Sequence, residues 1–316
     1  MSIAKFVKSL KNISQKDISI AGGKGASLGQ MIQTNIPVPS GFVILASAFD
    51  EFLRETDINI EIDAIRKKIN IKDMEGLEEG SEIIRDIILK KKFPEQLAKE
   101  IIIAFNKLGA KYVAVRSSAT AEDSEIDAWA GQLETYLYIT RNNLLKNIQK
   151  CWSSLYSPRA LFYRTERGLD KKQVSVAVVI QKMIKSEIAG VCFTVHPVTQ
   201  NKNQILIEAC WGLGEALVQG VITPDNYVVD KKTFNLIDVN INSQEKQIIK
   251  GKRGVITIAV SKDKKQKQKL SKKQIKELAK LCIKIEKNYK KPQDIEWALE
   301  KGNFYITQSR PITTLK

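Results

Sequence analysis

The spacing of apolar residues changes near residue 173, and this change limits the fold more than any other feature of the sequence. Before it, apolar residues recur every three or four positions over long stretches, which is typical of amphipathic helices. After it, short runs rich in β-branched residues predominate, as in 174–180 and 188–195. We therefore predict an α+β protein with an N-terminal lobe over residues 1–172 and a C-terminal, β-rich lobe over residues 173–316.

The composition indicates a folded protein outside the membrane. The 316 residues are 43% hydrophobic, enough for a sizeable core, and no apolar run reaches the about 18 residues of a membrane helix. Met1 to Leu10 contains no apolar run of signal-peptide length, so we expect a cytoplasmic protein with no membrane partner. The cysteines have no CxxC spacing, and His196 is the only histidine. The sequence thus argues against a zinc site and against a histidine-based triad.

The net charge of +16 raises the question of a nucleic-acid partner. Most of the basic residues are lysine, whereas base recognition usually depends on the bidentate arginine side chain. Many lysines fall in residues 261–291, where Ile275, Leu278, Cys282 and Ile285 recur at helical spacing. We predict an amphipathic helix there with a solvated lysine face, and contact with an acidic partner is the alternative. Nucleic acid is not expected to be the main partner.

A glycine-rich segment near the N-terminus has the ingredients of a phosphate-binding turn. Gly22, Gly23 and Gly25 surround Lys24, and helical spacing of apolar residues follows. Glycine lets backbone N–H groups approach an anion, a helix N-terminus favours negative charge, and lysine adds a positive charge. The spacing is not that of a P-loop, so the segment alone is only a weak indication of phosphate binding.

Arg116 follows a predicted strand over residues 112–115. A guanidinium at this place is expected to point into a cleft and bind an anion, and an ion pair with Glu122 or Asp123 is the structural alternative. A second apolar strand, 178–180, runs into a connector that contains Met183. Its backbone could read the edge of an adenine with Met183 beneath the ring, or Met183 could simply be part of the core.

The C-terminal hairpin gives the sharpest chemical signal. Side chains two residues apart on a strand share a face. If residues 301–303 form a three-residue loop, Glu296 lies opposite Gln308 and Asp294 opposite Arg310, whereas a two-residue turn would put the pairs on opposite faces. Two carboxylates and an amide oxygen suit Mg²⁺, and the arginine suits a phosphoryl group. A polar, solvent-facing hairpin is the alternative.

Short segments spread over nearly the whole chain resemble one family. They are GGKGASLG (22–29), IPVPSGF (36–42), VAVRSSATAED (113–123), AGQLETY (130–136), AGVCFT (189–194), WGLGEA (211–216), TPD (223–225), QDIEWA (293–298) and QSRPI (308–312). In this order they resemble the N-terminal nucleotide-binding domain of the dikinases that use phosphoenolpyruvate. That family includes phosphoenolpyruvate synthase, pyruvate phosphate dikinase and rifampicin phosphotransferase.

The resemblance implies a two-lobed, ATP-grasp-like domain that uses ATP and Mg²⁺. It implies that Lys24, Arg116 and Arg310 are the catalytic residues, with Lys24 and Arg116 on the phosphates and Arg310 beside the phosphoryl group in transfer. The other implied site residues are Gly131 and Thr135 on the phosphate side, Gln181 and Met183 at the adenine, and Glu296 and Gln308 on Mg²⁺ with Asp294 nearby.

The family reaction splits ATP to AMP, passing the β-phosphoryl to a histidine on a swivelling domain and the γ-phosphoryl to water or phosphate. The resemblance therefore implies a phosphotransferase, a component of a phosphoenolpyruvate synthase-like (pyruvate, water dikinase-like) enzyme. Its partners would be a phosphohistidine domain or subunit and a pyruvate-binding domain or subunit, neither of which the 316 residues contain, and His196 is not in a phosphohistidine context. The alternatives are a related dikinase with rifampicin or a phenol as acceptor, or a non-catalytic nucleotide-binding module.

Overall fold

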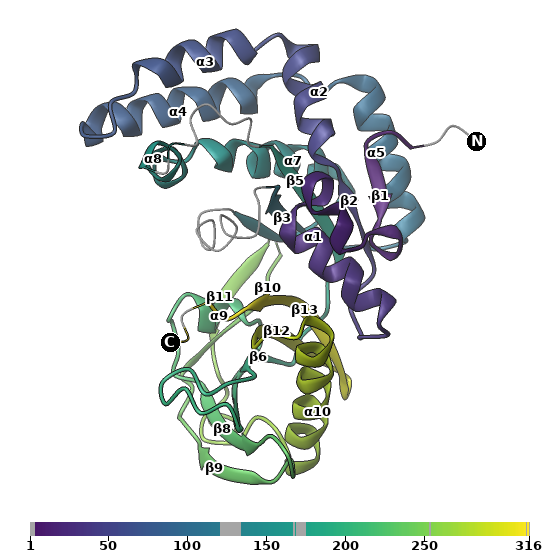
Figure 1. Cartoon of the computed structure of the whole chain (residues 1–316), viewed down its shortest axis with the longest axis vertical. Coiled ribbons are helices and arrows are strands. Elements are labelled where there is room, and N and C mark those ends of the chain that lie inside the picture. The colour runs from purple at the N-terminus through teal and green to yellow at the C-terminus, as the bar shows by residue number, and fades with distance from the viewer. Residues whose placement is uncertain are drawn as a thin grey trace. The chain divides into compact units, whose positions relative to one another are not determined.

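The computed structural model describes residues 4–120, 134–166, 168, 175–252, 254–313 and 315. The chain forms two compact units, one of Met1–Gln30 with Ser40–Met183 and the other of Met31–Pro39 with Ile184–Lys316 (Figure 1). Each unit combines helices with a β-sheet, so the predicted α+β class is confirmed. Among the helices in the described part of the chain, none is both long and apolar enough to cross a membrane.

The first unit is built on a five-stranded antiparallel sheet. In spatial order its strands are β1 (Val7–Ser9), β2 (Gly41–Ile44), β5 (Val176–Lys182), β3 (Val113–Ala119) and β4 (Thr135–Ile139). Its helices include α1 (Ile18–Gln33), α2 (Ala46–Thr56), α3 (Asn59–Lys68), α4 (Met74–Lys90), α5 (Glu95–Leu108), α7 (Leu144–Ser153) and α8 (Pro158–Glu166). Apolar residues of α2, α3, α4, α5, α7 and α8 and of one sheet face form the core, in which Trp152 stacks on Phe49 and Phe93.

Helix α1 lies on the other face of this sheet. A Cβ on Gly25 would lie 3.3 Å from Val43 Cγ2 and 3.7 Å from Val179 Cγ2, so the helix backbone approaches the strands closely. Val43 and Val179 are directly opposite each other, whereas Phe42 and Ile180 belong to the helix-covered core. Because successive strand residues alternate between faces, α1 and the core helices are on opposite sides of the sheet.

Strand β5 belongs to the first unit, because it pairs with both β2 and β3. The boundary expected near residue 173 places this strand in the second lobe, whereas the compact units divide after Met183 and residues 31–39 join the second unit. A change from helical to strand-type spacing marks where a strand begins. It carries no information about which sheet the strand joins.

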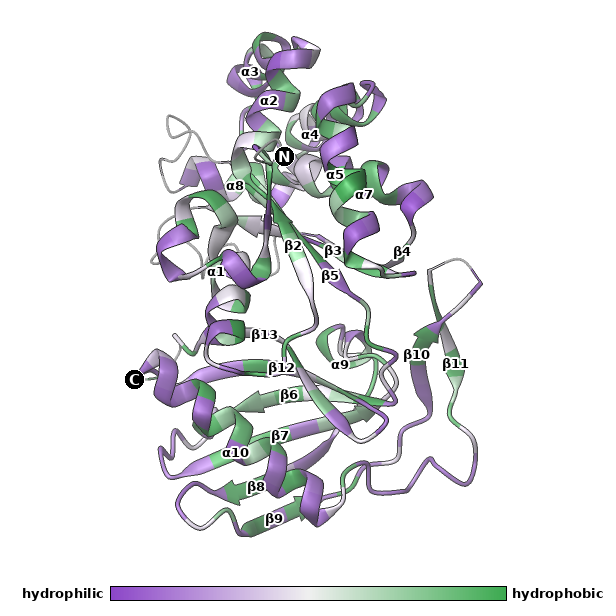
Figure 2. Ribbon diagram, turned by 90° about the vertical axis from the view of Figure 1, so that its right-hand side faces the viewer, coloured by the Kyte–Doolittle hydropathy of each residue, from purple (hydrophilic) through white to green (hydrophobic). Residues whose placement is uncertain are grey.

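The second unit is built on a six-stranded antiparallel sheet with one long helix on a face (Figure 2). Its strands, in spatial order, are β13 (Asn303–Pro311), β12 (Gln293–Glu300), β6 (Ile188–Phe193), β7 (Gln204–Trp211), β8 (Asp225–Asp230) and β9 (Leu236–Asn240). Helix α10 (Lys272–Tyr289) contacts β12 and β7. A separate hairpin of β10 (Lys246–Lys250) and β11 (Val255–Ala259) adjoins the single-turn helix α9 (Glu215–Val218).

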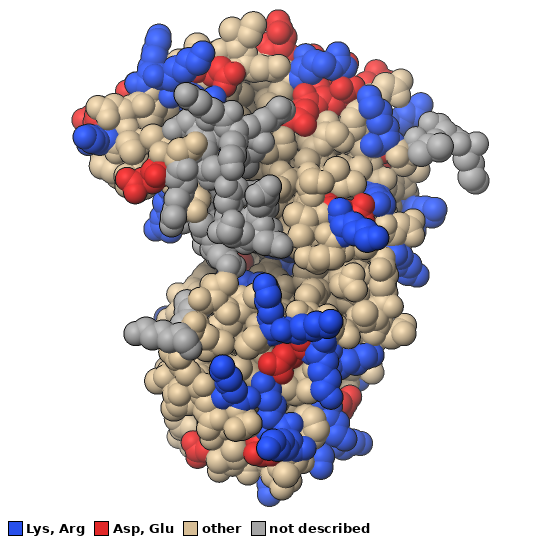
Figure 3. All heavy atoms as spheres, viewed as in Figure 1, with Lys and Arg blue, Asp and Glu red and all other residues tan. Residues whose placement is uncertain are grey.

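Residues 272–289 of the lysine-rich segment form α10, which confirms the predicted helix, whereas residues 261–271 lie outside it. The helix begins with a capping box in which Ser271 Oγ accepts a hydrogen bond from the Gln274 N–H. Leu278 and Cys282 are buried on its apolar side, while lysines such as Lys276 are exposed. Figure 3 shows lysine and arginine side chains gathered over this unit. All four cysteines of the chain are free and buried, as expected for reduced thiols.

Candidate functional site

The glycine-rich segment forms a kink inside α1 that is docked on strand β3. Gly22 has φ +69°, which breaks the helix. Ser118 Oγ of β3 donates a hydrogen bond to the Ala21 carbonyl at 2.9 Å and accepts one from the Gly25 N–H at 3.2 Å. A Cβ on Gly22 would lie 2.2 Å from Ser118 Oγ and 2.4 Å from the Ser118 carbonyl oxygen. The segment can therefore approach β3 this closely only with glycine at position 22.

We expect Gly22→Ala to destabilise the first unit by more than the about 1 kcal/mol that a positive φ alone costs a non-glycine residue. Gly109→Ala is the control for a positive φ without a close neighbour, because Gly109 lies in the left-handed helical region (φ +64°, ψ 28°) and a Cβ added there would have no atom within 4 Å, whereas Gly22 has ψ 165°. Urea unfolding of the two variants measures the difference. Equal losses of stability would show that the close approach to Ser118 has no energetic weight.

Arg116, Thr135 and Gln181 share the sheet face on which α1 lies. Thr135 is directly opposite Arg116, and Gln181 is opposite Ala114. Arg116 Nη1 donates a hydrogen bond to Gln181 Oε1 at 3.2 Å, and these two residues are only 7% and 2% exposed. The Gln181 Nε2 is buried with no hydrogen-bond partner among the residues described. The pair thus offers a desolvated positive charge and an unused amide donor.

Lys24 and Met183 are both hydrogen-bonded to backbone carbonyls of β3 or of the residue just before it. The Lys24 ammonium donates to the Ser117 carbonyl of β3 at 3.0 Å. Met183 directly follows β5, is half-buried, and donates its N–H to the Tyr112 carbonyl at 3.1 Å. Lys24 is thereby tied to the strand that carries Arg116.

Strand β3 does not end at Arg116, as the sequence suggested, but continues to Ala119 with Ser117 and Ser118 buried. Polar residues are tolerated there because each hydroxyl has a backbone partner, Ser117 Oγ donating to the Glu134 carbonyl at 2.9 Å. The expected site residue Gly131, and the alternative Arg116 partners Glu122 and Asp123, lie outside the described residues.

The C-terminal hairpin pairs the expected polar residues. Glu296 is directly opposite Gln308, and Asp294 is directly opposite Arg310, which confirms the predicted pairing. Because partners two residues apart share a face, all four side chains project from the same side of the sheet.

The turn that produces this register differs from the prediction. Glu300 pairs with Asn303, so the turn contains two residues, Lys301 and Gly302, with φ +49° and +78°. Positive φ at both positions is typical of a type I′ turn. A two-residue turn alone would place the polar pairs on opposite faces, but the register shifts by one residue at Thr307, the bulged residue of β13. The bulge restores the pairing.

Asp294 and Arg310 form an ion pair at the edge of the sheet. Arg310 Nε and Nη2 lie 2.8 and 2.7 Å from Asp294 Oδ2, and the side chains are 46% and 14% exposed for Arg310 and Asp294. Burial raises the pKa of the Asp294 carboxyl above its usual value, although Arg310 opposes this shift. The carboxylate thus holds a half-exposed guanidinium in place, with further N–H groups left to bind an anion.

The residues present fit a magnesium ion that takes some of its ligands from the protein and the others from a phosphate and from water. Within the described ranges, no group of three or more His, Cys, Asp or Glu residues could hold a metal ion by itself. Mg²⁺ is usually bound by one or two carboxylates, with waters and substrate phosphates completing its shell. The opposed oxygens of Glu296 and Gln308 match that pattern, since Asp294 is already engaged by Arg310.

Glu208 is an acidic residue of this face that the sequence analysis missed. It lies on β7 opposite Val191, and Val191 is opposite Glu296. Burial, and secondarily the nearby Asp294 carboxylate, raise the pKa of Glu208. Sequence spacing gives no signal for Glu208. It is aligned with Glu296 only because β6 lies between β7 and β12 in the sheet.

A small apolar platform adjoins the Glu296–Gln308 pair on the same face. Ala189 and Ala298 are directly opposite each other, and they pack with Ile184 and Tyr305. Ala298 is two residues from Glu296, which is about 7 Å along the strand. An apolar surface at that distance from hard oxygen ligands suits a molecule with a flat base at one end and phosphates at the other.

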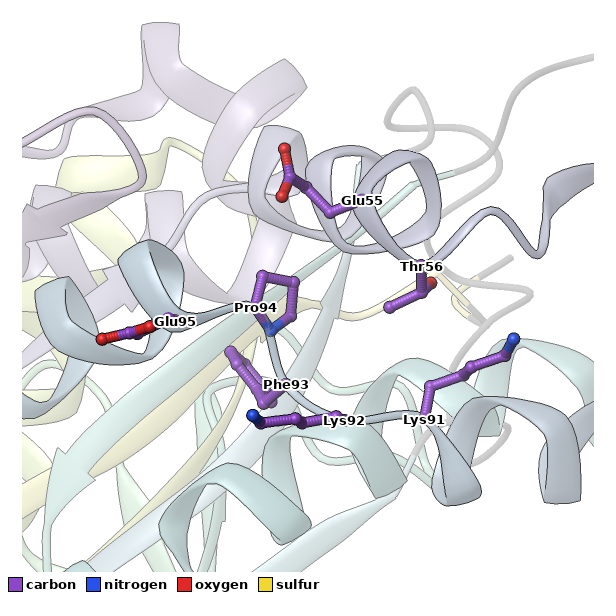
Figure 4. Close-up of a pocket in the computed structure, with 7 residues that line it drawn as sticks. All are labelled: Glu55, Thr56, Lys91, Lys92, Phe93, Pro94 and Glu95. Carbon is purple, nitrogen blue, oxygen red and sulfur yellow. The ribbon is translucent and has the colours of Figure 1, made fainter.

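A pocket of about 350 Å³ lies elsewhere in the first unit, where the C-terminal end of α2 meets the connection between α4 and α5 (Figure 4). It is lined by Glu55, Thr56, Lys91, Lys92, Phe93, Pro94 and Glu95. It contains none of the expected site residues, so it is not the site considered above.

The chain is similar in sequence to a known protein family and to several of its members. Residues 18–316 match the family described as pyruvate phosphate dikinase, AMP/ATP-binding domain. The probable phosphoenolpyruvate synthase of Methanocaldococcus jannaschii is 47% identical over 320 residues, covering 99% of this chain and 27% of that protein. The phosphoenolpyruvate synthase of Pyrococcus furiosus is 39% identical over 360 residues, covering 99% and 44%. The chain thus spans less than half the length of either relative.

Among solved structures, a D-alanine–D-alanine ligase from Bacillus anthracis is similar with 11% identity and a TM-score of 0.28, covering 70% of this chain and 57% of the ligase. The sequence matches are far stronger, and they extend over the segments on which the family resemblance was based. That resemblance is confirmed: the chain belongs to the pyruvate phosphate dikinase AMP/ATP-binding domain family.

Proposed function

We propose that this chain is the ATP-binding, phosphoryl-transferring component of a phosphoenolpyruvate synthase-like (pyruvate, water dikinase-like) enzyme with an ATP-grasp-like domain. The observation that carries the proposal is the pairing of Glu296 with Gln308 and of Asp294 with Arg310 on one sheet face. The names of the similar proteins support the same reaction class. The free, buried cysteines are in keeping with a cytoplasmic location.

The first unit would supply groups for the phosphates and the base. Arg116 is only 7% exposed. The attraction between its guanidinium and a phosphate is therefore screened less by water than that of a surface charge. Lys24 and Thr135, with Gly131, would add further phosphate contacts. Gln181 and Met183 would contact the adenine, and the unpartnered Gln181 Nε2 supplies a donor for it.

The second unit would supply the groups around the transferred phosphoryl. Glu296 and Gln308 would hold Mg²⁺, which when bound neutralises charge on the phosphate oxygens. Arg310 would stabilise the phosphoryl group as its charge redistributes, and Asp294 would keep that guanidinium in place. The apolar platform of Ala189 and Ala298 would exclude water on the side of the base.

In the proposed reaction the β-phosphoryl of ATP passes to a histidine nitrogen and AMP is released, while the γ-phosphoryl is transferred to water and leaves as phosphate. The histidine would belong to a separate domain or subunit, and a pyruvate-binding domain or subunit would receive the phosphoryl next. The extra length of the similar proteins leaves room for such domains.

The test is AMP formation by the purified chain with ATP and Mg²⁺, alone and with a separately purified phosphohistidine-domain protein of the same family. We expect AMP only when both proteins are present, and none after the metal is chelated. ADP as the sole nucleotide product, or AMP formed equally fast without the partner protein, would contradict the proposal.

A further inference from the structure

Five lysines form a stripe along the exposed side of α10. They are Lys273, Lys276, Lys280, Lys284 and Lys287, and all five residues are exposed. Steps of three or four residues keep side chains on one side of a helix, so at 1.5 Å per residue this lysine stripe is about 21 Å long. In Figure 3 basic side chains gather where Figure 1 shows α10.

The charge of the lysine stripe is not balanced by carboxylates of the described residues. None of these carboxylates forms an ion pair with any of the five ammonium groups. Glu286 of α10 is bound by Lys231 at 2.8 Å, and Glu277, at the edge of the stripe, is the only other acid of the helix. Neutral contacts, such as that of Lys280 with the Phe234 ring at 5.9 Å, leave the charge in place.

The lysines that precede α10 differ in this respect. Lys265 is paired with Glu245, and Lys267 lies 3.9 Å from Asp263. The lysine-rich segment thus contains lysines with a counter-charge before the helix and lysines without one on the helix. Like charges three or four residues apart on a helix are destabilising. An anion bound along the stripe would relieve this repulsion.

The lysine stripe and the Glu296–Gln308 pair belong to opposite sides of the sheet in the second unit. Cys282, on the buried side of α10, contacts the thiol of Cys192 on β6. Cys192 is opposite Ile295, whose side chain is on the other sheet face from that of Glu296. A ligand on the stripe would therefore leave the proposed metal site free.

The side chains on α10 indicate which kind of anion fits the stripe. The helix contains no arginine, and none of its large apolar side chains is exposed. Protein–protein interfaces usually contain aromatic and arginine anchors and few lysines, and single-stranded nucleic acids stack their bases on aromatic side chains. The stripe offers neither kind of anchor. Interfaces with the phosphate backbone of a duplex are polar and strongly basic, as this stripe is.

We infer that the lysine stripe binds the phosphate backbone of a nucleic-acid duplex without reading its sequence. The inference goes beyond the proposed function and does not depend on it. Lysine contributes a point charge that suits a phosphate, whereas base recognition usually depends on bidentate side chains such as arginine. Binding of this kind releases counter-ions from the duplex, so its affinity should fall steeply as the salt concentration rises.

The experiment measures the fluorescence anisotropy of a labelled duplex of mixed sequence, as RNA and as DNA, with the wild-type chain over a series of KCl concentrations. Five lysine–phosphate contacts predict a slope of about −4 to −5 for the logarithm of the association constant against that of the salt concentration. The triple variant Lys273→Gln, Lys276→Gln, Lys287→Gln should reduce the size of this slope by about 2 to 3. Glutamine is a good helix former, so α10 should stay intact.

The control is the triple variant Lys67→Gln, Lys68→Gln, Lys72→Gln, which changes three exposed lysines of the first unit and alters the net charge equally. It should bind the duplex as the wild type does, and saturating ATP with Mg²⁺ should not displace the duplex at constant ionic strength.

Four results would each overturn the inference. The first is no salt-dependent binding by the wild type. The second is an equal loss of binding in the control, which would show that only the overall charge of +16 matters. The third is displacement by ATP, which would place the duplex in the nucleotide site. The fourth is tighter binding of a polyglutamate peptide than of either duplex, which would indicate an acidic protein as the partner.

Discussion

Glu296→Ala is expected to form AMP at least about 100-fold more slowly than the wild-type chain when both are assayed with ATP, Mg²⁺ and the phosphohistidine-domain partner. Glu296 is directly opposite Gln308, and Asp294 is bound by Arg310, so loss of Glu296 would leave only the Gln308 amide oxygen of the proposed pair for the metal. The rate should also need a higher Mg²⁺ concentration to reach half its maximum. Quenched-flow or discontinuous AMP assays over a Mg²⁺ series measure both effects.

The control for this variant is Glu277→Ala, on the exposed side of α10, where removal of a carboxylate should leave the rate nearly unchanged. Gln308→Ala should resemble Glu296→Ala, with a smaller loss, because an amide oxygen carries no full charge. If Glu296→Ala kept the full rate at low Mg²⁺, the hairpin pair would not be the metal site.

Lys269→Ala is expected to destabilise the second unit by about 3–5 kcal/mol, the usual effect of removing one member of a buried ion pair. Lys269 Nζ lies 2.7 Å from Asp225 Oδ1, and both side chains have no exposed surface. The ammonium also donates to the Asn242 carbonyl at 2.7 Å, and the Tyr227 hydroxyl donates to Asp225 Oδ2 at 2.8 Å. Without Lys269 the Asp225 charge would be buried without a counter-ion.

Urea unfolding followed by tryptophan fluorescence measures this loss. Lys267→Ala is the matched control two residues away, since Lys267 and Asp263 are each 66% exposed and 3.9 Å apart. An exposed pair of this kind contributes less than about 1 kcal/mol. Similar losses for the two variants would show that burial of the Lys269–Asp225 pair has no special weight.

The position of Asp225 in the TPD segment shows how a family motif can be structural. The carboxylate ties β8 to the chain before α10 through the Lys269 backbone N–H at 2.9 Å as well as through its side chain. The sequence marks the segment as part of the resemblance, but not its partner 44 residues further on. The buried lysine could not be distinguished from its exposed neighbours, because composition alone makes the whole segment look solvated.

The C-terminal hairpin shows what strand periodicity can and cannot predict. The two-residue period correctly grouped Asp294 with Glu296 and Gln308 with Arg310. The loop length was wrong, and the pairing nevertheless held because the bulge at Thr307 compensates for the shorter turn. Bulges have no strong sequence signature, so the correct pairing was reached through an incorrect turn.

Contacts across the sheets were the least predictable part of the site. Arg116 was expected to point into a cleft, and its hydrogen bond to Gln181 on a different strand, which the β3–β5 pairing brings near, had no signal in the sequence. Glu208 gave no signal, since a lone glutamate in an apolar segment has many possible roles. Strand order, which no local pattern determines, decides which of these side chains meet.

The most direct test of the account uses ATP labelled at either the β- or the γ-phosphorus, incubated with Mg²⁺, the chain and its phosphohistidine-domain partner. The account predicts acid-labile label on the partner protein from β-labelled ATP only, with label from γ-labelled ATP appearing as free phosphate. Label transferred to protein from the γ-position, with ADP as the product, would contradict the central claim that this chain catalyses the first step of a dikinase reaction.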